Sequence, residues 1–458
     1  MPTLTRASLN SVNQNTLYQP AAPFVDMKQV ASIILGGGEG TRLYPLTLTR
    51  CKPAINFGGK YRLIDVPISN SIHADCHQIF VLTQFLSSSL HHHIFQTYMH
   101  GGRASGLIEI LTAEQKPAHK SWYQGTADAV RQNIDYLLES PVEYFLILSG
   151  DQLYNINFRE MVQFAKSVEA DVVVAALPVN RQQAKRMGIL QVDENGIINN
   201  FHEKPENLQL LDELRSPENL MSKIGVSAAS GRDYLGSMGI YLFKRDILAD
   251  LLKRDSREDF GQHLIPSQVK SGRVAAYLYE GYWEDIGTIE SFYEANMALT
   301  APQPLFNFHN ERYPIFTNRY DLPPAKFSNT HIKQTILCEG AVVEAEEITH
   351  SIIGTRSVID KGVIIRDSYL MGNDYYTSPV RDHHRLPNTP HIGEDSVISR
   401  AIIDKNVHIG KGVELINKKH VRHYDGHDVF IRDGIIIVPR GATIADGFNL
   451  DTVCQESR

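Results

Sequence analysis

A six-residue period in the C-terminal part of the chain restricts the fold more than any other feature. Divided into sixes from Ile353, the sequence reads IGTRSV, IDKGVI, IRDSYL and MGNDYY, and from Val397 it reads VISRAI, IDKNVH, IGKGVE and LINKKH. Each six opens with an aliphatic residue or Met, and such repeats stack as the coils of a parallel β-helix. Residues 377–396 break the phase, so we expect them to loop out. Ordinary β-sandwich strands with chance spacing are the alternative.

Residues 28–300 alternate short apolar runs with helix-like stretches. The runs expected as buried strands are VASIIL (30–35), IFVLT (79–83), YFLILSG (144–150), DVVVAALPV (171–179) and MGIYLF (238–243). A helix is expected over residues 126–140, with Thr126 as its cap. This alternation predicts an α/β fold with a mostly parallel sheet, whose ligands lie beyond the carboxyl ends of the strands.

With 458 residues, the chain exceeds the usual size of one domain. We expect a flexible tail (residues 1–27), a catalytic domain (28–300), a linker (301–330) and a β-helix domain (331–458). The linker is expected to be stiff and unpacked because it holds five prolines: Pro302, Pro304, Pro314, Pro323 and Pro324.

Composition argues against several classes of protein. A net charge of −7 disfavours a surface that binds nucleic acid, and no apolar run is long enough to predict a membrane helix. The segment from Met1 to Val25 lacks the apolar core of a secretory signal; it suggests a disordered tail, with an organelle transit peptide as the alternative. Four scattered cysteines fit a reducing compartment. The cytoplasm is therefore expected, or a plastid if the tail is a transit peptide.

A glycine-rich stretch, ILGGGEGTRLYPLTLTRCKP (34–53), follows the first expected strand. It is not a P-loop, because Gly40 is followed by Thr41-Arg42, and it lacks the third glycine of a dinucleotide fingerprint, where Leu43 stands. Glycines let backbone N–H groups approach a base and phosphates closely, while Arg42 and Lys52 add positive charge. The stretch therefore indicates a site for nucleotide phosphates, with a plain strand–helix turn as the alternative.

The glycine-rich stretch is followed by KPAINFGGKYRLIDVPISN, VLTQF, WYQGTADAV, SGDQLY, FHEKP, LGSMGIYLF, DFGQHLIP and YWEDIGT. In this order, from about Val30 to Gly447, the chain resembles the glucose-1-phosphate adenylyltransferase family (ADP-glucose pyrophosphorylases). The resemblance implies a Rossmann-like nucleotidyltransferase domain followed by a left-handed parallel β-helix. It implies adenylyl transfer from ATP to α-D-glucose 1-phosphate, giving ADP-glucose and diphosphate with Mg²⁺ as cofactor, the committed step of glycogen or starch synthesis.

The resemblance also implies site residues. Arg42, Lys52, Asp151, Lys204 and Asp285 would be catalytic, with Asp151 and Asp285 holding the metal. The positions implied to bind substrate are Leu35, Gly36, Gly37, Gly38, Gln84, Trp122, Tyr123, Gly125, Thr126, Gly188, Glu203, Lys204, Ser237, Tyr241, Asp259, Phe260 and Trp283. The residues alone leave open that Glu284 replaces Asp285, that Glu203 and Lys204 form a surface pair, and that the aromatic residues only pack.

Family members are commonly tetramers controlled by phosphorylated metabolites. The resemblance implies an effector pocket between the two domains, lined by Arg50, Arg62, Lys405 and Arg440, with solvated charges as the alternative. This chain has Thr49 where the family usually has Lys, so we expect a weakened activator response. No cysteine precedes Cys51, so the N-terminal intersubunit disulfide of some plant forms cannot form. A homotetramer is expected, and a heterotetramer is the alternative.

Three other functions remain open from the sequence. The chain could transfer a different base, giving a UDP-, GDP- or dTDP-sugar, or it could be a non-catalytic regulatory subunit that keeps the fold. An acyltransferase in the β-helix is a third option, although no acyl-CoA site is evident. His91, His92 and His93 are consecutive on an expected helix and point in different directions, so we do not expect them to bind one metal ion.

Overall fold

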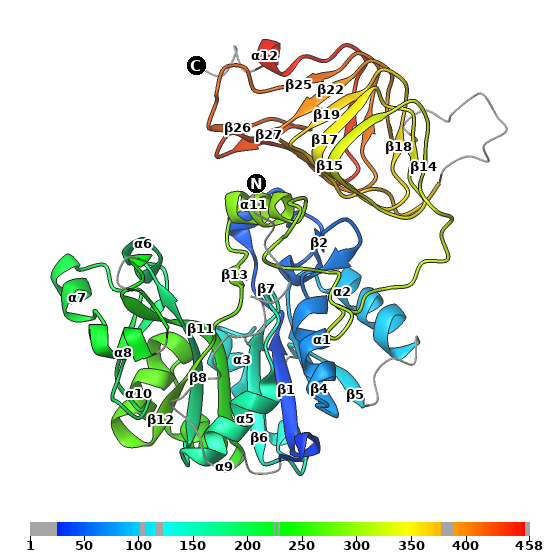
Figure 1. The fold of residues 1–458 in the computed structure, drawn as a ribbon. Helices are drawn as coiled ribbons and strands as arrows, with labels where there is room; N and C mark the ends of the chain where they lie inside the picture. The colour runs from blue at the N-terminus through cyan, green and yellow to red at the C-terminus, as the bar shows by residue number, and fades with distance from the viewer. Residues whose placement is uncertain are drawn as a thin grey trace, which may run out of the picture.

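The computed structural model describes residues 25–100, 106–114, 122–223, 225–227, 230–376 and 389–453. An α/β domain forms the larger part, and a β-helix lies against one end of it (Figure 1). The catalytic-domain helix α11 (Ile289–Ala298) lies between the sheet and the β-helix in this view.

Among the described residues, nine strands form the central sheet in the order β10-β9-β11-β6-β1-β4-β5, with β8 beside β11 and β12 beside β8. Their bounds are β1 Val30–Leu35, β4 Gln78–Thr83, β5 Leu107–Thr112, β6 Tyr144–Ser149, β8 Val172–Val179, β9 Gly188–Val192, β10 Ile198–Glu203, β11 Tyr234–Lys244 and β12 Val274–Leu278. Of these nine described strands, β10 and β11 alone run antiparallel to the others. The predicted α/β fold with a mostly parallel sheet is confirmed.

Helices cover both faces of the sheet, as the continuous apolar strands predict. On β1, Val30 and Ile34 belong to the core that includes α1 (Asp65–His73) and α5 (Phe158–Ser167). Ala31 and Ile33 point the other way. They belong to the core with α3 (Thr126–Gln132), α9 (Arg245–Arg254) and α10 (Ile265–Ser271).

The helix expected over residues 126–140 is divided into α3 and α4 (Ile134–Leu137). Asn133 separates them, with ψ near 3°. Thr126 does not cap α3, because Gly125 is the N-cap residue and the Thr126 hydroxyl instead donates to Asp259 Oδ2 at 3.1 Å. The expected cap was therefore wrong, and this threonine joins α3 to a distant segment of the chain.

The β-helix consists of stacked coils in which equivalent residues pair directly. On one face Ile348 pairs with Ile365, Ile365 with Ile398 and Ile398 with Leu415. The strands of this face are β17 (Glu347–Ile353), β19 (Ile364–Arg366), β22 (Val397–Ser399) and β25 (Glu414–Leu415), and β15 (His331–Leu337) precedes them. The second face has β20 (Tyr369–Leu370), β23 (Ala401–Ile403) and β28 (Ile435–Val438); the third has β14 (Lys326–Phe327), β16 (Val342–Val343), β18 (Val358–Ile359), β21 (His391–Ile392), β24 (His408–Ile409) and β29 (Thr443–Ile444).

The strict six-residue phase fails once in each coil. Buried residues follow one another at Ile348, Ile353, Ile359, Ile365 and Leu370, so the spacing is five, six, six and then five again. Leu370 and Ile398 therefore fill the coil interior, whereas Met371 and Val397 do not. One corner of each coil therefore has five residues instead of six. The missing residue changes the phase of the repeat, so Met371 faces the catalytic domain.

The expected loop is shorter than residues 377–396. Residues 377–388 lie outside the described part, but His391–Ile392 already form β21 in register with β18 and β24. A second interruption, residues 416–434, separates β25 from β28 and contains the hairpin of β26 (His423–Asp425) and β27 (Phe430–Arg432).

The proline-rich segment is packed against the catalytic domain, contrary to the expectation of an unpacked connector. Phe306 is buried, and Phe308 stacks on Tyr61 with ring centroids 4.1 Å apart. The backbone N–H of Phe316 donates to Ser69 Oγ at 2.8 Å. Aromatic side chains between the prolines thus fix the path of this segment.

The β-helix is attached to the catalytic domain through an apolar face. Ile352, Tyr369, Met371 and Ile402 belong to the same core as β1 and α1. Tyr293 on α11 adds a hydrogen bond from its hydroxyl to the Asp367 carbonyl at 2.7 Å. The two domains are therefore held together by continuous packing.

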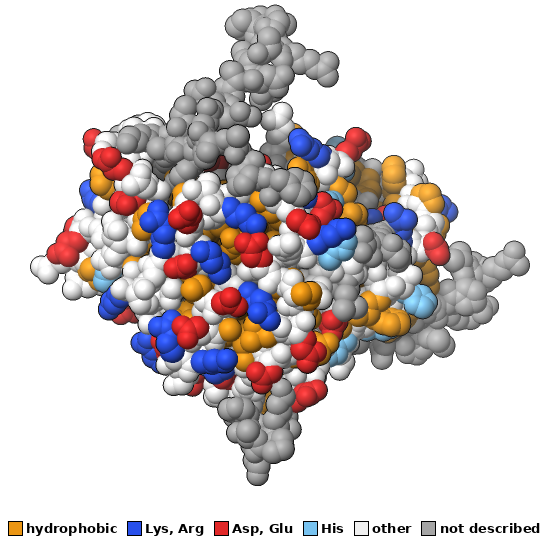
Figure 2. Space-filling view, turned by 90° about the horizontal axis from the view of Figure 1, so that it is seen from below, with side chains coloured by type: hydrophobic (Ala, Val, Ile, Leu, Met, Phe, Trp, Pro, Cys, Tyr) orange, Lys and Arg blue, Asp and Glu red, His pale blue; other side chains and the backbone are white. Residues whose placement is uncertain are grey.

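Within the described ranges, no helix combines the length and the hydrophobicity that crossing a bilayer requires. Figure 2 shows the face seen from below, on which acidic and basic side chains alternate without gathering into a patch of one sign.

Candidate active site

A cavity of about 470 Å³ opens where the carboxyl ends of β1, β4 and β6 meet. This is the edge at which parallel sheets bind ligands. The predicted site residues that line it are Leu35, Gly37, Gly38, Gln84, Tyr123, Gly125, Thr126, Asp151, Glu203, Tyr241, Asp259 and Phe260. Residues from seven separate segments of the sequence therefore converge on one cavity.

Lys52, Asp151 and Asp285 form a group that we name the pocket cluster. Lys52 Nζ lies 2.5 Å from Asp151 Oδ2 and 3.9 Å from Asp285 Oδ1. Asp151 follows β6, while Asp285 ends β13 (Trp283–Asp285), which pairs antiparallel with β7 (Gln152–Tyr154). In this register Asp285 lies opposite Gln152, directly beside Asp151. The short two-stranded ladder thus brings together two carboxylates that are distant in sequence.

The same ladder distinguishes Glu284 from Asp285 by the face to which each side chain points. Successive side chains of a strand point to opposite faces, so Glu284 and Asp285 cannot both face Lys52. The contact with Lys52 Nζ belongs to Asp285. Glu284 points away from the pocket cluster.

The two carboxylates have opposite pKa shifts. Burial opposes the ionisation of Asp151, but the Lys52 ammonium and the Ser149 hydroxyl bound to its carboxylate hold its pKa below the usual value. The pKa of Asp285 is raised, first because it is partly buried and then because the charge of Asp151 lies beside it. The side chain of Asp285 is still 46% exposed, against 20% for Asp151. Asp285 is therefore the more accessible carboxylate, and an additional positive charge beside it would favour its ionised form.

Glu203, the last residue of β10, also lines the cavity. A Cβ atom added at Gly188 would come within 2.7 Å of Glu203 Oε2, and one added at Gly261 within 3.0 Å. These two glycines therefore leave the space that the carboxylate occupies. Lys204 Nζ lies 3.1 Å from Glu203 Oε1, and 58% of the Lys204 side chain is exposed.

The backbone of Tyr123 is fixed by one side chain. The backbone N–H of Tyr123 donates to Gln84 Oε1 at 2.6 Å, and Gln84 Nε2 donates back to the Tyr123 carbonyl at 3.4 Å. Trp122 lies outside the cavity lining and is 55% exposed. Its ring stacks on that of Phe85, a lining residue, with ring centroids 6.2 Å apart.

The remaining predicted residues lie next to the lining rather than in it. Gly36 lies beneath the glycine loop, where an added Cβ would be 3.3 Å from the Leu82 carbonyl oxygen. Ser237 is buried, and its Oγ accepts from the Gly239 N–H. The Arg42 guanidinium is next to Asp285, because a Cβ at Gly287 would be 3.6 Å from Arg42 Nη1 and 3.2 Å from Asp285 Oδ2.

Sequence reasoning missed Gln152, which lines the cavity. Its Nε2 donates to the Met238 carbonyl at 2.8 Å, and its Oε1 accepts from Trp283 Nε1 at 3.3 Å. Gln152 thus connects β11 to β13 behind the two carboxylates. Its position directly after Asp151 in SGDQLY was the available signal.

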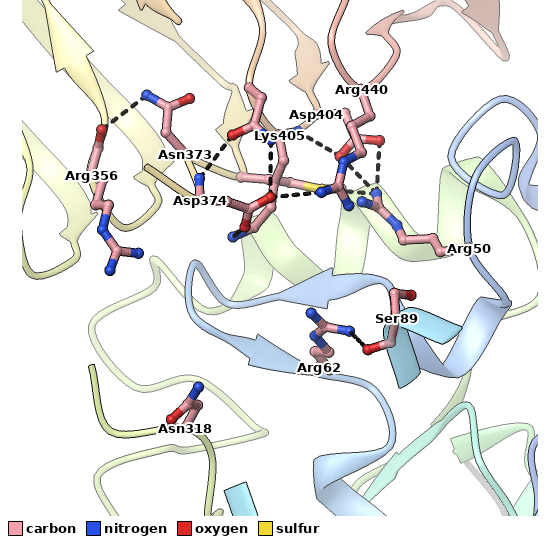
Figure 3. A network of polar contacts seen from close by, with 12 residues as sticks. Arg50, Arg62, Ser89, Asn318, Arg356, Asn373, Asp374, Asp404, Lys405 and Arg440 are labelled. Atoms are coloured by element: carbon pink, nitrogen blue, oxygen red, sulfur yellow. Dashed lines mark hydrogen bonds and ion pairs between the residues drawn. The ribbon is translucent and has the colours of Figure 1, made fainter. Parts of the chain in front are cut away.

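The four cations expected in an effector pocket do lie at the domain boundary (Figure 3). We name them, with Asp374 and Asp404, the interdomain cluster. Arg50 Nη2 lies 2.7 Å from both carboxylate oxygens of Asp404. Lys405 Nζ and Arg440 Nη2 each lie 2.7 Å from an oxygen of Asp374. Arg50 and Lys405 are buried and therefore are not solvated charges, whereas Arg440 is paired with Asp374 but exposed.

Arg62 differs from the other three, because Nη1 donates to the Ser89 carbonyl at 2.7 Å. Arg50 is 1% exposed, and its Nε and Nη1 atoms are buried without a hydrogen-bond partner among the described residues. Burial lowers the pKa of Lys405, and burial also lowers that of Arg62. The cluster holds four cations against two carboxylates, so it retains an excess of positive charge.

His91 and His93 contact different elements. His91 Nε2 is 2.8 Å from Thr83 Oγ1, while His93 Nε2 is 2.6 Å from Asp65 Oδ1 in the core. The described residues contain no group of three or more His, Cys, Asp or Glu side chains suited to a metal ion.

Strand order, a glycine loop after β1 and paired carboxylates at the strand ends define the class of a nucleotide-dependent group-transfer protein. Residues 31–302 match the family model described as nucleotidyl transferase, so the chain belongs to the nucleotidyl transferase family. Residues 319–448 match the model described as the GLGC left-handed parallel β-helix domain. The two domains together are the architecture characteristic of glucose-1-phosphate adenylyltransferases, which confirms the resemblance drawn from the motifs.

Proposed function

We propose that the chain transfers the adenylyl group of ATP to α-D-glucose 1-phosphate, releasing diphosphate and ADP-glucose. The observation that carries this proposal is the pocket cluster, in which one ammonium contacts two carboxylates at the rim of the cavity. In a nucleotidyl transferase with this β-helix, such a cluster fits a reaction that handles a nucleoside triphosphate and a sugar phosphate.

The reaction balances without an external proton donor. A phosphate oxygen of glucose 1-phosphate attacks the α-phosphorus of ATP, and the bond from that phosphorus to the bridging oxygen breaks. The electron pair leaves with diphosphate, so negative charge accumulates on the leaving group. Lys52 and Arg42 lie where they can stabilise that charge, which is the largest contribution a protein makes to such transfers.

The glucose 1-phosphate would lie across the cavity from the glycine loop. Glu203 offers a carboxylate to sugar hydroxyls in the space left by Gly188 and Gly261. Lys204 is bound to Glu203 and exposed on the same side, so its ammonium is available for the sugar phosphate. Backbone N–H groups of the glycine loop would approach the nucleotide phosphates.

Mg²⁺ fits the donor set of the pocket cluster. Asp151 and Asp285 supply carboxylate oxygens alone, which suits this hard cation, and the Lys52 ammonium lies 2.5 Å from one carboxylate and 3.9 Å from the other. Asp151 and Asp285 would hold the Mg²⁺ ion, whose positive charge would offset the negative charge of the nucleotide phosphates. The raised pKa of Asp285 supports the same assignment, because a second cation beside the two carboxylates would favour the ionised form of Asp285.

Regulation by a phosphorylated metabolite belongs to the same proposal. The interdomain cluster has surplus positive charge, and two nitrogen atoms of the buried Arg50 guanidinium have no hydrogen-bond partner within the described ranges. Guanidinium groups are suited to phosphate oxygens. Thr49 is exposed one position before Arg50 and adds no charge, so we expect a modest activator response. A homotetramer is the expected assembly, and sedimentation of the purified chain tests it.

Release of diphosphate by the purified chain tests the reaction. The assay contains Mg²⁺, glucose 1-phosphate and one of ATP, UTP, GTP or dTTP at equal concentration. We expect ATP to give the highest kcat/KM. A preference for UTP, GTP or dTTP would overturn the choice of base, and inactivity with every nucleotide would support a regulatory subunit.

A further inference from the structure

The glycine-rich loop is held from outside the catalytic domain, by the hairpin that interrupts the β-helix. This feature is separate from the interdomain cluster, and it deepens the proposed function because it concerns the placement of Arg42. The inference rests on that function.

The loop that carries Arg42 is closed on itself. A 3₁₀ helix, Thr41–Leu43, follows Gly40, which has φ 65°. Thr47 Oγ1 donates to the Gly40 carbonyl at 3.1 Å and so joins the two ends of the loop. Leu43 and Leu46 are buried in the core, whereas Tyr44 is exposed on the outer side. A loop bonded in this way moves as a unit, so a contact at Tyr44 affects the position of Arg42.

The hairpin belongs to an insertion that coil stacking does not require. Strand β28 pairs with β23, as in Ile402 with Ile437, although these two partners are much farther apart in sequence than the regular partners Ile348 and Ile365. The additional residues include β26 and β27, and β27 pairs antiparallel with β28. In Figure 1 the hairpin lies at the edge of the β-helix that faces the catalytic domain.

Side chains on β27 alternate between the two domains. Ile431 belongs to the coil interior, while Phe430 belongs to the core shared with the catalytic domain. Arg432, two positions after Phe430, is directed to the same side. Its guanidinium is held by the carbonyls of Tyr424 and Ile431 at 3.1 and 2.9 Å and by the carboxylate of Asp425 at 2.5 Å.

The loop and the hairpin meet at Tyr44. The Tyr44 ring meets Phe430 edge to face, with ring centroids 5.6 Å apart. The Arg432 guanidinium lies 5.9 Å from the centroid of the Tyr44 ring and 5.9 Å from that of Phe430. Both arrangements are favourable for aromatic rings. Arg432 and Arg42 also line one cavity of about 590 Å³, together with Glu39, Thr41, Tyr44, Thr47 and Leu48.

We propose that Tyr44, Phe430 and Arg432 are positioning residues that hold the Arg42 loop against the diphosphate side of the active site. Because three acceptors hold the Arg432 guanidinium, it presents a fixed surface to Tyr44 rather than binding the substrate itself. The β-helix thus contributes to catalysis in every turnover, through a contact that no effector has to form.

Kinetics in both directions test this proposal. Tyr44→Ala and Phe430→Ala are expected to lower kcat/KM for ATP, and for diphosphate in the reverse reaction, by at least about tenfold, because small displacements of a charge-stabilising group cost that much or more. KM for glucose 1-phosphate should stay within about twofold, because the contact does not reach the sugar side of the cavity. Tyr44→Phe keeps the ring and should restore the wild-type values.

His427→Ala is the matched control, because His427 lies at the tip of the same hairpin with its side chain 95% exposed. It should leave all constants unchanged, and unfolding midpoints should be compared for every variant. If an alanine variant does not fold, Arg432→Met serves instead, with an expected loss of about two- to fivefold in kcat/KM for ATP.

Wild-type constants in Tyr44→Ala and Phe430→Ala would overturn the proposal. An equal rise of KM for all substrates together with a lower unfolding midpoint would also overturn it, because the contact would then only stabilise the fold. An inactive wild-type chain would overturn the proposed function and this inference with it, whereas an active wild type with unaffected variants would overturn this inference alone.

Discussion

The pocket cluster and the interdomain cluster use the same chemistry for different ends. In the pocket cluster one cation is shared by two carboxylates, and the outer carboxylate is exposed with a raised pKa. In the interdomain cluster cations outnumber carboxylates, and Arg50 and Lys405 are almost completely buried. The first cluster lacks positive charge and the second lacks negative charge. The difference indicates which ligand would complete each: a metal ion with phosphates in one, an anion in the other.

The largest effect is expected from the exposed carboxylate of the pocket cluster. Asp285→Asn should lower kcat by about 10²–10³-fold, because it removes one of the two carboxylates proposed to hold Mg²⁺ and so weakens the stabilisation of charge on the phosphates. Glu284→Gln is the matched control, since this neighbour points to the other face of the same strand. Its kcat, measured by diphosphate release, should stay within about threefold of the wild type. Equal losses in both variants would contradict the assignment of Asp285.

The second effect concerns stability at the interdomain cluster. Asp404→Asn leaves the buried Arg50 charge without its carboxylate, which should cost about 3 kcal/mol of the free energy of unfolding. The double variant Arg50→Met with Asp404→Asn should regain part of that loss, because no uncompensated charge remains. Urea unfolding measures both variants. If the double variant is no more stable than Asp404→Asn alone, Arg50 and Asp404 do not act as a buried ion pair.

The third prediction uses the pKa of Asp374. Burial opposes its ionisation, but Lys405 and Arg440 lower its pKa from 3.8 to about 2. A carboxyl group whose pKa is lower in the folded state stabilises the protein above its unfolded pKa, and this stabilisation disappears as the pH falls through the folded value. Wild type should therefore be more stable than Asp374→Asn by about 1–2 kcal/mol at neutral pH, and the difference should shrink between about pH 4 and pH 2.

Urea unfolding at a series of pH values measures that difference. Asp246→Asn is the control, because the Asp246 side chain is 92% exposed. Its difference from the wild type should not change over the same pH range. A pH-independent difference for Asp374→Asn would mean that this carboxylate does not balance the interdomain cations.

The pocket cluster was predictable from the sequence, and the interdomain cluster only in part. Asp151 follows an apolar strand, and the carboxyl end of a parallel strand has a known location, so its place could be inferred. Asp285 depended on a motif, because its position results from the short two-stranded ladder with β7. Asp374 and Asp404 were missed. They reach the domain boundary because each coil has one shortened corner, whereas a strict period of six places Met371 inside the coil instead of beside Arg50.

The smallest effect is expected at Thr49, which lies at the solvent side of the interdomain cluster. Thr49 is exposed beside buried Arg50, so Thr49→Lys would add one cation at the solvent side of a cluster that already has a surplus. An exposed charge contributes little, so the concentration of phosphorylated effector that gives half of the maximal response should fall by only about two- to fivefold. Thr49→Met has similar length without the charge and should match the wild type.

Activity is measured over a panel of phosphorylated metabolites at low and at high salt, and added salt should reduce the gain because it screens exposed charges. If Thr49→Lys and the wild type respond identically to every effector, Thr49 does not limit anion binding, and the positive charge that the interdomain cluster already holds is sufficient.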